Sequence, residues 1–114
     1  MELHIGASSE TITRVALVGM FDMVAVDEME SRFWAATAGR GKNTIVDLAK
    51  LSFVASLGMG VLEKAYKELK KKGAKIVLLN PQSDVETALR AAHLHEIMPI
   101  AHGEDEAQRL LQPV

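Results

Sequence analysis

Cysteine is absent from this sequence of 114 residues. The absence excludes a disulfide scaffold, a cysteine-ligated zinc site and a catalytic thiol, and it agrees with a reducing compartment. No apolar run approaches the roughly 18 residues of a membrane span, and the first residues lack the basic region and apolar core of a signal peptide. We therefore expect a cytoplasmic protein that does not insert directly into a membrane.

The sequence also lacks an excess of either charge, because its formal net charge is only −2. A nucleic-acid-binding domain usually has a basic excess, so nucleic acid is not an expected partner. Apolar residues make up 48% and charged residues 25% of the chain, which is ordinary for a globular domain. The length predicts one domain, residues 1–114, with a core that needs no disulfide or metal.

What the sequence does contain is an alternation of strand-like and helix-like segments. Short apolar or β-branched runs predict strands at 11–18, 44–48, 75–79 and 97–100, and Leu3 and Ile5 suggest a first strand before them. Amphipathic spacing predicts helices at 23–38, around 61–69, at 83–92 and at 103–111. Alternating strands and helices imply an α/β fold with a mixed, mostly parallel sheet of four to five strands, flanked by about four helices.

Helix starts are marked by residues that can bond to free backbone N–H groups. Asp22 is expected to cap the first helix and Ser56 the second. Ser83 and Glu86 have the spacing of a capping box at the start of the third.

Two loops follow the carboxyl ends of predicted strands, where parallel sheets gather their functional residues. These loops, 19–22 and 50–58, are expected to lie side by side. They are unusually apolar, and methionine-rich surfaces suit adaptable protein recognition, although core packing is an equal alternative. The apolar residues by the first strand end are Met20, Phe21 and Met23, and those by the second are Leu57 and Met59.

Two interpretations of Ser56 are open: it caps the helix, or it carries a phosphate at the helix start. The glycines near it do not form a dinucleotide fingerprint, because Glu63 occupies the third glycine position.

His93, His95 and His102 are expected to be solvated and not metal ligands. Asp22 and Asp47 could in principle act as an acid–base pair, but no further group completes a reaction centre. We therefore expect no enzyme activity, no metal and no cofactor.

Taken in order, several segments resemble the STAS domain, which is shared by sulfate transporters and bacterial anti-sigma factor antagonists. "VDLAKLSFVASLGMGVL" resembles its central signature, and residues 19–22 resemble an earlier G-x-L-D element. Residues 72–75 followed by "IVLLN" resemble its helix–turn–strand, and "AAHLHEIMPI" with "EDEAQRLL" resembles its closing segment. The resemblance covers essentially the whole chain.

The resemblance implies a binding protein and not an enzyme. An antagonist of this kind docks on an anti-sigma factor that is also a serine kinase, and docking releases the sigma factor. The kinase phosphorylates a serine at a helix start, and a phosphatase reverses the reaction. The partner-binding surface implied here lies in two short segments, Met20, Phe21, Asp22 and Met23 together with Ala55, Ser56, Leu57, Gly58 and Met59.

The sequence departs from the family pattern at the switch itself. Ala55 replaces the motif's aspartate, Ser56 matches its first serine, and Leu57 occupies the usual phospho-acceptor position. Three outcomes are open: constitutive binding, use of Ser56 as the acceptor, or a different task. The alternatives to sigma-factor control are an accessory subunit of a membrane transporter and a small anion- or nucleotide-binding domain.

Overall fold

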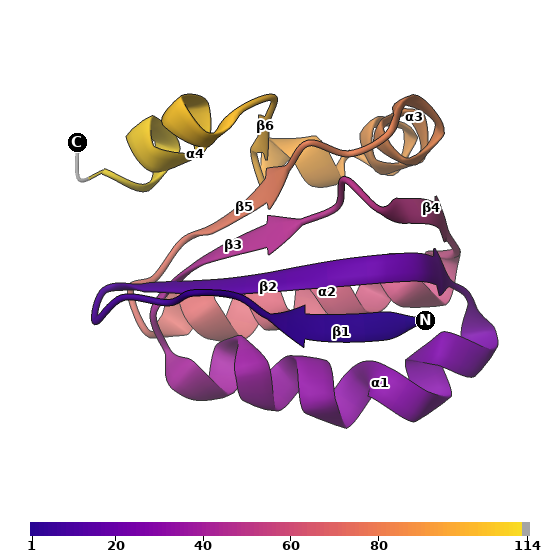
Figure 1. The fold of residues 1–114 in the computed structure, drawn as a ribbon, viewed down its shortest axis with the longest axis horizontal. Helices are drawn as coiled ribbons and strands as arrows, with labels where there is room; N and C mark the ends of the chain where they lie inside the picture. The colour runs from indigo at the N-terminus through magenta and orange to yellow at the C-terminus, as the bar shows by residue number, and fades with distance from the viewer. Residues whose placement is uncertain (113–114) are drawn as a thin grey trace.

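Strand β2 (Ile12–Phe21) is the longest strand and pairs with three others. The computed structural model describes residues 1–112 (Figure 1). The other strands are β1 (Glu2–Ile5), β3 (Asn43–Asp47), β4 (Leu51–Val54), β5 (Ile76–Leu79) and β6 (Ile100–Ala101). The helices are α1 (Met23–Ala36), α2 (Ser56–Lys71), α3 (Ser83–Ala91) and α4 (Glu104–Leu111), with 3₁₀ turns η1 (Ala38–Arg40) and η2 (Leu94–Glu96).

The sheet is mixed and mostly parallel, in the order β1-β2-β3-β5-β6, with β4 paired to β2 off this path. Among residues 1–112, the β1–β2 hairpin is antiparallel and the other four pairings are parallel. The predicted fold class is therefore confirmed, but the sheet has six strands where four to five were expected. The additional strand is β4, which lies within the loop predicted at 50–58.

The pairing of β2 changes partner partway along the strand. Its first half pairs with β3 as far as Ala16 and Asp47, and its last residues pair with β4 from Gly19 onwards. A bulge follows at once, because β4 advances two residues, from Leu51 to Phe53, while β2 advances one. Gly19 has φ of +106°, a conformation in which a side chain would be strained.

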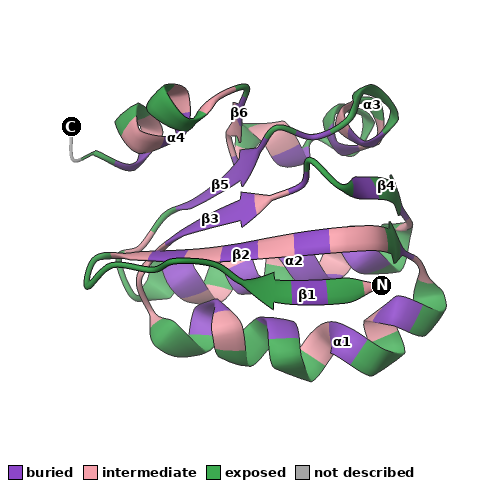
Figure 2. Cartoon of the chain, viewed as in Figure 1, coloured by how far each residue is buried: buried purple, intermediate pink, exposed green. Residues whose placement is uncertain are grey.

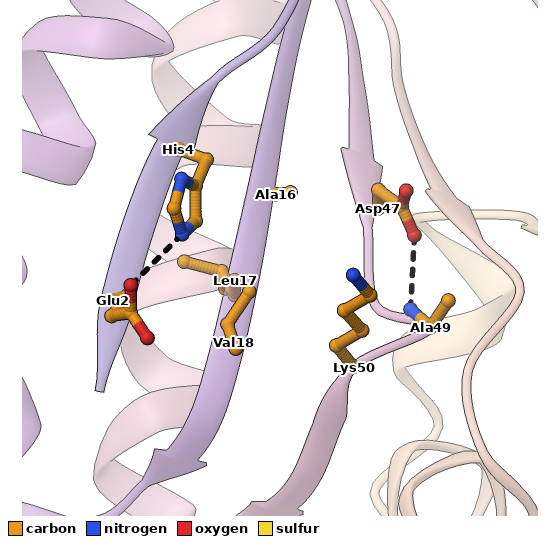
Figure 3. A pocket seen from close by; sticks show the side chains of 8 residues that line it. All are labelled: Glu2, His4, Ala16, Leu17, Val18, Asp47, Ala49 and Lys50. Carbon is orange, nitrogen blue, oxygen red and sulfur yellow. Dashed lines mark hydrogen bonds and ion pairs between the residues drawn. The ribbon is translucent and has the colours of Figure 1, made fainter.

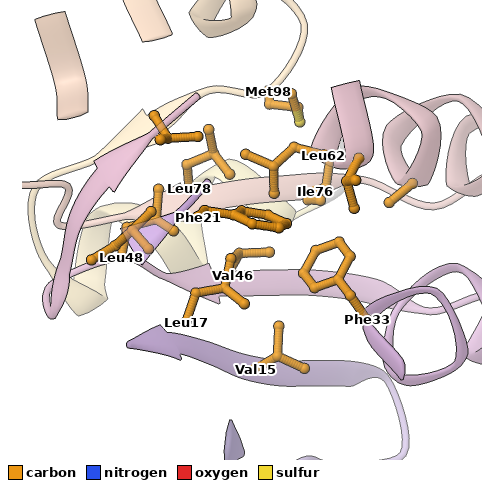
Figure 4. Close-up of a cluster of buried hydrophobic side chains, with 14 of the residues drawn as sticks. Val15, Leu17, Phe21, Phe33, Val46, Leu48, Leu62, Ile76, Leu78 and Met98 are labelled. Carbon is orange, nitrogen blue, oxygen red and sulfur yellow. The ribbon is translucent and has the colours of Figure 1, made fainter. Parts of the chain in front are cut away.

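The larger core lies between the sheet and helices α1 and α2. Alternate residues of β2 point into it, including Val15, Leu17 and Phe21, and Phe33 of α1 meets them from the helix layer (Figure 4). All four are at most 1% exposed. Each such side chain contributes roughly 1.5–3 kcal/mol by its burial, so this packing fixes both helices on one face of the sheet.

Helix α4 covers only part of the opposite face. Its residues Ala107 and Leu111 pack against Ile45 of β3 and Val77 of β5. Among residues 1–112, no helix covers the part of the same face formed by β1 and β2 (Figure 2). His4 of β1 is exposed.

Several predicted boundaries differ from the observed ones. The strand predicted at 11–18 continues as β2 to Phe21, through residues that were expected to form a loop. The first helix ends at Ala36 and not at residue 38, and a 3₁₀ turn follows it. The last strand comprises only Ile100–Ala101, because residues 94–96 form a 3₁₀ turn before it. It lies at the edge of the sheet, the position that a neighbouring proline suggests.

The capping predictions were right for one helix and wrong for two. Asp22 caps α1 by accepting a hydrogen bond from the Ala25 N–H at 2.9 Å. Ser56 and Ser83 are instead the first helical residues of α2 and α3, whose N-caps, Ala55 and Gln82, make no side-chain cap bond. Ala55 takes the extended cap conformation because its N–H donates to the Phe21 carbonyl at 2.9 Å, which prolongs the β2–β4 ladder by one residue.

An ion pair ties α4 to β2. The Arg14 guanidinium donates from both terminal nitrogens to the two carboxylate oxygens of Glu104, with Nη1 and Oε1 2.9 Å apart. The hydrogen bond from Arg14 lowers the pKa of Glu104 below its usual value. Because the folded-state pKa is depressed, the stabilisation is present above the pKa of the unfolded carboxyl group and disappears as pH falls through the folded value.

We expect Glu104→Gln to lower the free energy of unfolding near pH 7 and to leave it unchanged at a pH below both pKa values. The loss should not exceed about 1 kcal/mol, because exposed ion pairs contribute little and Glu104 is 52% exposed. Urea unfolding of both proteins across the acidic range measures this. Asp105→Asn, in the same helical turn and outside any ion pair formed by residues 1–112, is the control; an equal loss there would contradict the assignment.

Candidate functional site

The carboxyl ends of β2 and β4 carry an exposed apolar surface. Its members are exposed by 44–68% and we call them the strand-end surface: Met20, Met23, Val24, Phe53 and Leu57. Met20 and Phe53 are cross-strand neighbours, while the others begin the two helices that follow these strands. In Figure 2 the exposed colour covers the tip of β2 and the first turn of α1. Single exposed apolar residues are ordinary, whereas five at one corner of a small domain make this corner the candidate interaction site.

Phe21 and Gly58 hold the two halves of this surface together. The Phe21 carbonyl accepts the Ala55 N–H, and the first turn of α2 then lies directly against Phe21. A Cβ atom at Gly58 would be 2.8 Å from the Phe21 oxygen and 2.9 Å from its Cγ. The expectation that the two loops lie side by side is therefore confirmed, and the close approach depends on a glycine.

The structure divides the predicted surface residues into three groups. Met20, Met23, Ser56 and Leu57 are exposed, and Asp22, Ala55 and Met59 are half-buried. Phe21 and Gly58 are buried, so the expectation that Phe21 belongs to an exposed apolar cluster was wrong. Phe21 faces inward because it follows Val15 and Leu17 on the core side of β2. Its role at the surface is to position the neighbours that are exposed.

Two exposed members, Val24 and Phe53, were missed by the sequence analysis. Phe53 was missed because Leu51–Val54 was assigned to the loop predicted at 50–58, whereas it forms strand β4. The available signal was its apolar and aromatic composition, which is typical of strands. Val24 was missed because it lies one residue beyond the predicted segment.

Ser56 is exposed, and its hydroxyl makes no cap bond in α2. It lies at the rim of a shallow hollow of about 220 Å³, which Glu63 also lines. The helix start favours an anion, whereas the nearby carboxylate opposes one. The serine is thus sterically accessible, but no cation lines the hollow to receive a phosphate.

The remaining candidate groups are engaged elsewhere. His93 and His102 are exposed and contact Glu96 and Glu86 at 3.3 and 2.8 Å, while His95 is half-buried. Among residues 1–112, no group of three or more His, Asp or Glu side chains could hold a metal ion. Within the same range, no helix has both the length and the apolar character needed to cross a bilayer.

The two aspartates considered as an acid–base pair lie apart along β2. Asp47 is paired in register with Ala16, and its Oδ1 accepts the Ala49 N–H at 2.9 Å. Asp22 follows the end of the same strand, six residues further along, which corresponds to about 20 Å. The structure does not bring these carboxylates into one cleft.

Comparison with known proteins gives a consistent result. A profile of the STAS domain matches residues 7–107. No curated protein matches the chain significantly. Among solved structures, a STAS domain protein from Planctomyces limnophilus, described as an anti-sigma factor antagonist, superposes with a TM-score of 0.81 at 18% identity, covering 96% of this chain and 97% of that one.

Two further structures show the range of proteins that share this fold. The Bacillus anti-sigma factor antagonist SpoIIAA in its unphosphorylated form has a TM-score of 0.77 at 21% identity and 99% coverage of both chains. The mouse anion transporter Slc26a9 has a TM-score of 0.71 at 20% identity, covering 89% of this chain but only 18% of the transporter. At these identities the likenesses describe the fold.

We expect Gly58→Ala to destabilise the protein by about 1–3 kcal/mol, the usual range for overpacking. The added methyl group would overlap the Phe21 backbone, which cannot move without disturbing the β2–β4 ladder. Gly60 lies in the same helix and has no atom within 4 Å of an added Cβ, so it is a matched control. Gly60→Ala should be neutral or stabilising by up to about 1 kcal/mol, because alanine is the better helix former. Urea unfolding of the three proteins decides this, and equal stability of the two variants would refute the packing argument.

Proposed function

The chain belongs to the STAS domain family, and we propose that it acts as a protein-binding module of the anti-sigma factor antagonist type. Its partner would be an anti-sigma factor with serine kinase activity, and docking would release a sigma factor for transcription. The observation that carries the proposal is the strand-end surface, which exposes five apolar side chains around the start of α2.

The chemistry of this surface suits protein recognition. Methionine, phenylalanine and leucine side chains contribute contact area without a charge that must be desolvated. Asp22 caps α1, and Gly58 seats α2 on Phe21, so the backbone beneath the surface is well ordered before binding. A preorganised surface loses less conformational freedom when it binds, which favours affinity.

Leu57 occupies the centre of the proposed mechanism. It stands at the position where the family resemblance implies the phospho-acceptor, and its side chain is 54% exposed. A leucine cannot accept a phosphate, so the negative charge that would disrupt an apolar interface cannot be added there. We propose that the chain binds its partner constitutively, and that any phosphatase in the circuit has no substrate at this residue.

An accessory role in membrane transport is a second candidate. The similarity to a segment of the anion transporter Slc26a9 supports it, because a STAS-like domain occurs there within a larger transport protein. On this alternative the partner would be a permease or a transport ATPase and not a kinase. The same strand-end surface would serve for docking.

We expect Leu57→Asp to weaken partner binding by at least about 30-fold, which corresponds to 2 kcal/mol or more for an unpaired charge buried at an interface. Affinity capture from native cells, with mass spectrometry, would first identify the partner. Calorimetric titration of the purified partner then gives the affinities. Ile5→Asp is the control, because Ile5 is equally exposed, at 56%, and pairs with Val15 at the other end of β2.

Equal affinities for wild type and Leu57→Asp would overturn the proposed surface. A kinase among the captured proteins supports the antagonist role, whereas a permease or ATPase that binds through Leu57 supports the transport role.

We expect little or no phosphate transfer to this chain from its cognate kinase. The usual acceptor position is Leu57, and Ser56 faces a hollow lined by Glu63 and by no cation. Incubation with kinase and ATP, followed by intact-mass measurement, tests this. A gain of one phosphate that disappears in Ser56→Ala, but not in Ser52→Ala, would show instead that Ser56 has become the acceptor.

A further inference from the structure

A hollow of about 430 Å³ opens on the part of the sheet that α4 leaves uncovered. The hollow exists because the segment between β3 and β4 does not pair with β2. Pairing stops at Ala16 and Asp47 and resumes at Gly19 and Leu51, so the intervening residues of β2 have no strand beside them on that side. Its size lies within the usual range of small-molecule sites.

The walls of the hollow carry charge of both signs (Figure 3). On the β1 side, His4 Nε2 lies 3.1 Å from the Glu2 carboxylate. On the opposite side, the hollow is lined by Asp47, at the end of β3, and by Lys50, in the segment that joins β3 to β4. The floor between them is apolar and is formed by Ala16 and Val18.

Asp47 and Lys50 are both left without an ionic partner. Within residues 1–112 neither takes part in an ion pair, and they do not pair with each other. One Asp47 oxygen accepts the Ala49 N–H, which leaves the second oxygen available. Arg14 feels the charge of Asp47 but is held in an ion pair by Glu104.

We propose that this hollow binds a small zwitterion, an α-amino acid with an aliphatic side chain. The Lys50 ammonium group meets the ligand carboxylate, the free Asp47 oxygen accepts from the ligand ammonium group, and the aliphatic side chain lies on Ala16 and Val18. Each end then gains a charge-assisted hydrogen bond, the stronger class of such bonds.

The charges favour a zwitterion over a simple ion. With Glu2 and Asp47 negative, Lys50 positive and His4 neutral, the lining carries a formal charge of −1. A simple anion would be repelled by two carboxylates. A simple cation would be repelled by Lys50 and would leave that ammonium group unpaired. A ligand with both charges satisfies both unpaired groups at once. The site is independent of the proposed partner docking.

Three related probes test the proposal by titration into ¹⁵N-labelled protein: L-leucine, N-acetyl-L-leucine, which keeps only the negative charge, and L-leucinamide, which keeps only the positive one. L-leucine should shift the amide resonances of Ala16, Val18, Ala49 and Lys50 saturably. Each single-charge probe should bind at least about tenfold more weakly, as expected for the loss of one charge-assisted contact. Equal binding of either derivative, or no saturable shift with L-leucine, overturns the proposal.

Variants locate the two contacts. Lys50→Gln and Asp47→Asn should each weaken L-leucine binding about tenfold, since each removes one ionic contact and keeps a similar shape. Lys64→Gln, on the exposed face of α2, is the control and should bind like wild type. Well-dispersed amide spectra establish that each variant is folded. Unchanged affinity in both hollow variants overturns the assignment.

Discussion

The close contact between Phe21 and Gly58 is the constraint on which the functional corner of this protein depends. Phe21 acts through two groups: its ring lies in the core, and its carbonyl accepts the Ala55 N–H just after β4. The carbonyl oxygen and the ring together lie against the first turn of α2. A side chain at Gly58 would separate the helix from the strand. The positions of Met20, Phe53 and Leu57 relative to one another therefore follow from a contact in which none of them takes part.

The irregular path between β3 and β4 has two consequences. By leaving β2 at Asp47 and returning at Leu51, the chain carries β4 to the far end of β2, where Phe53 is placed beside Met20. The same departure opens the hollow beside Ala16 and Val18. A continuous strand would have filled the hollow, so one local departure from regular pairing accounts for both candidate binding regions.

Leucine at residue 57, the position where the family resemblance implies the phospho-acceptor, decides the electrostatics of the proposed interface. A hydroxyl group at residue 57 would allow a charge of about −1.5 to −2 to be added and removed. Leucine removes that possibility and adds apolar contact area at the same place. Ser56, the remaining hydroxyl at the helix start, points to a rim where Glu63 already supplies negative charge. These two features of the helix start are what support the proposal of constitutive binding.

Local pattern alone was enough to determine the α/β class, the order of the long elements and the cap at Asp22, because apolar periodicity and capping depend on residues close together in the chain. The two loops after the strands were also placed side by side correctly, since parallel strands end at the same edge. The strand β4 and the starts of α2 and α3 were not predictable in this way. Ala55 became the cap because of a hydrogen bond to Phe21, 34 residues earlier in the chain.

The tertiary structure also decided which apolar residues are exposed. Phe21 and Met20 are adjacent and similarly apolar, yet one is fully buried and the other half exposed. The side of β2 that each occupies, and which helices cover that side, separates them. Such coverage is set by packing between distant segments, and so it could be read only from the assembled fold.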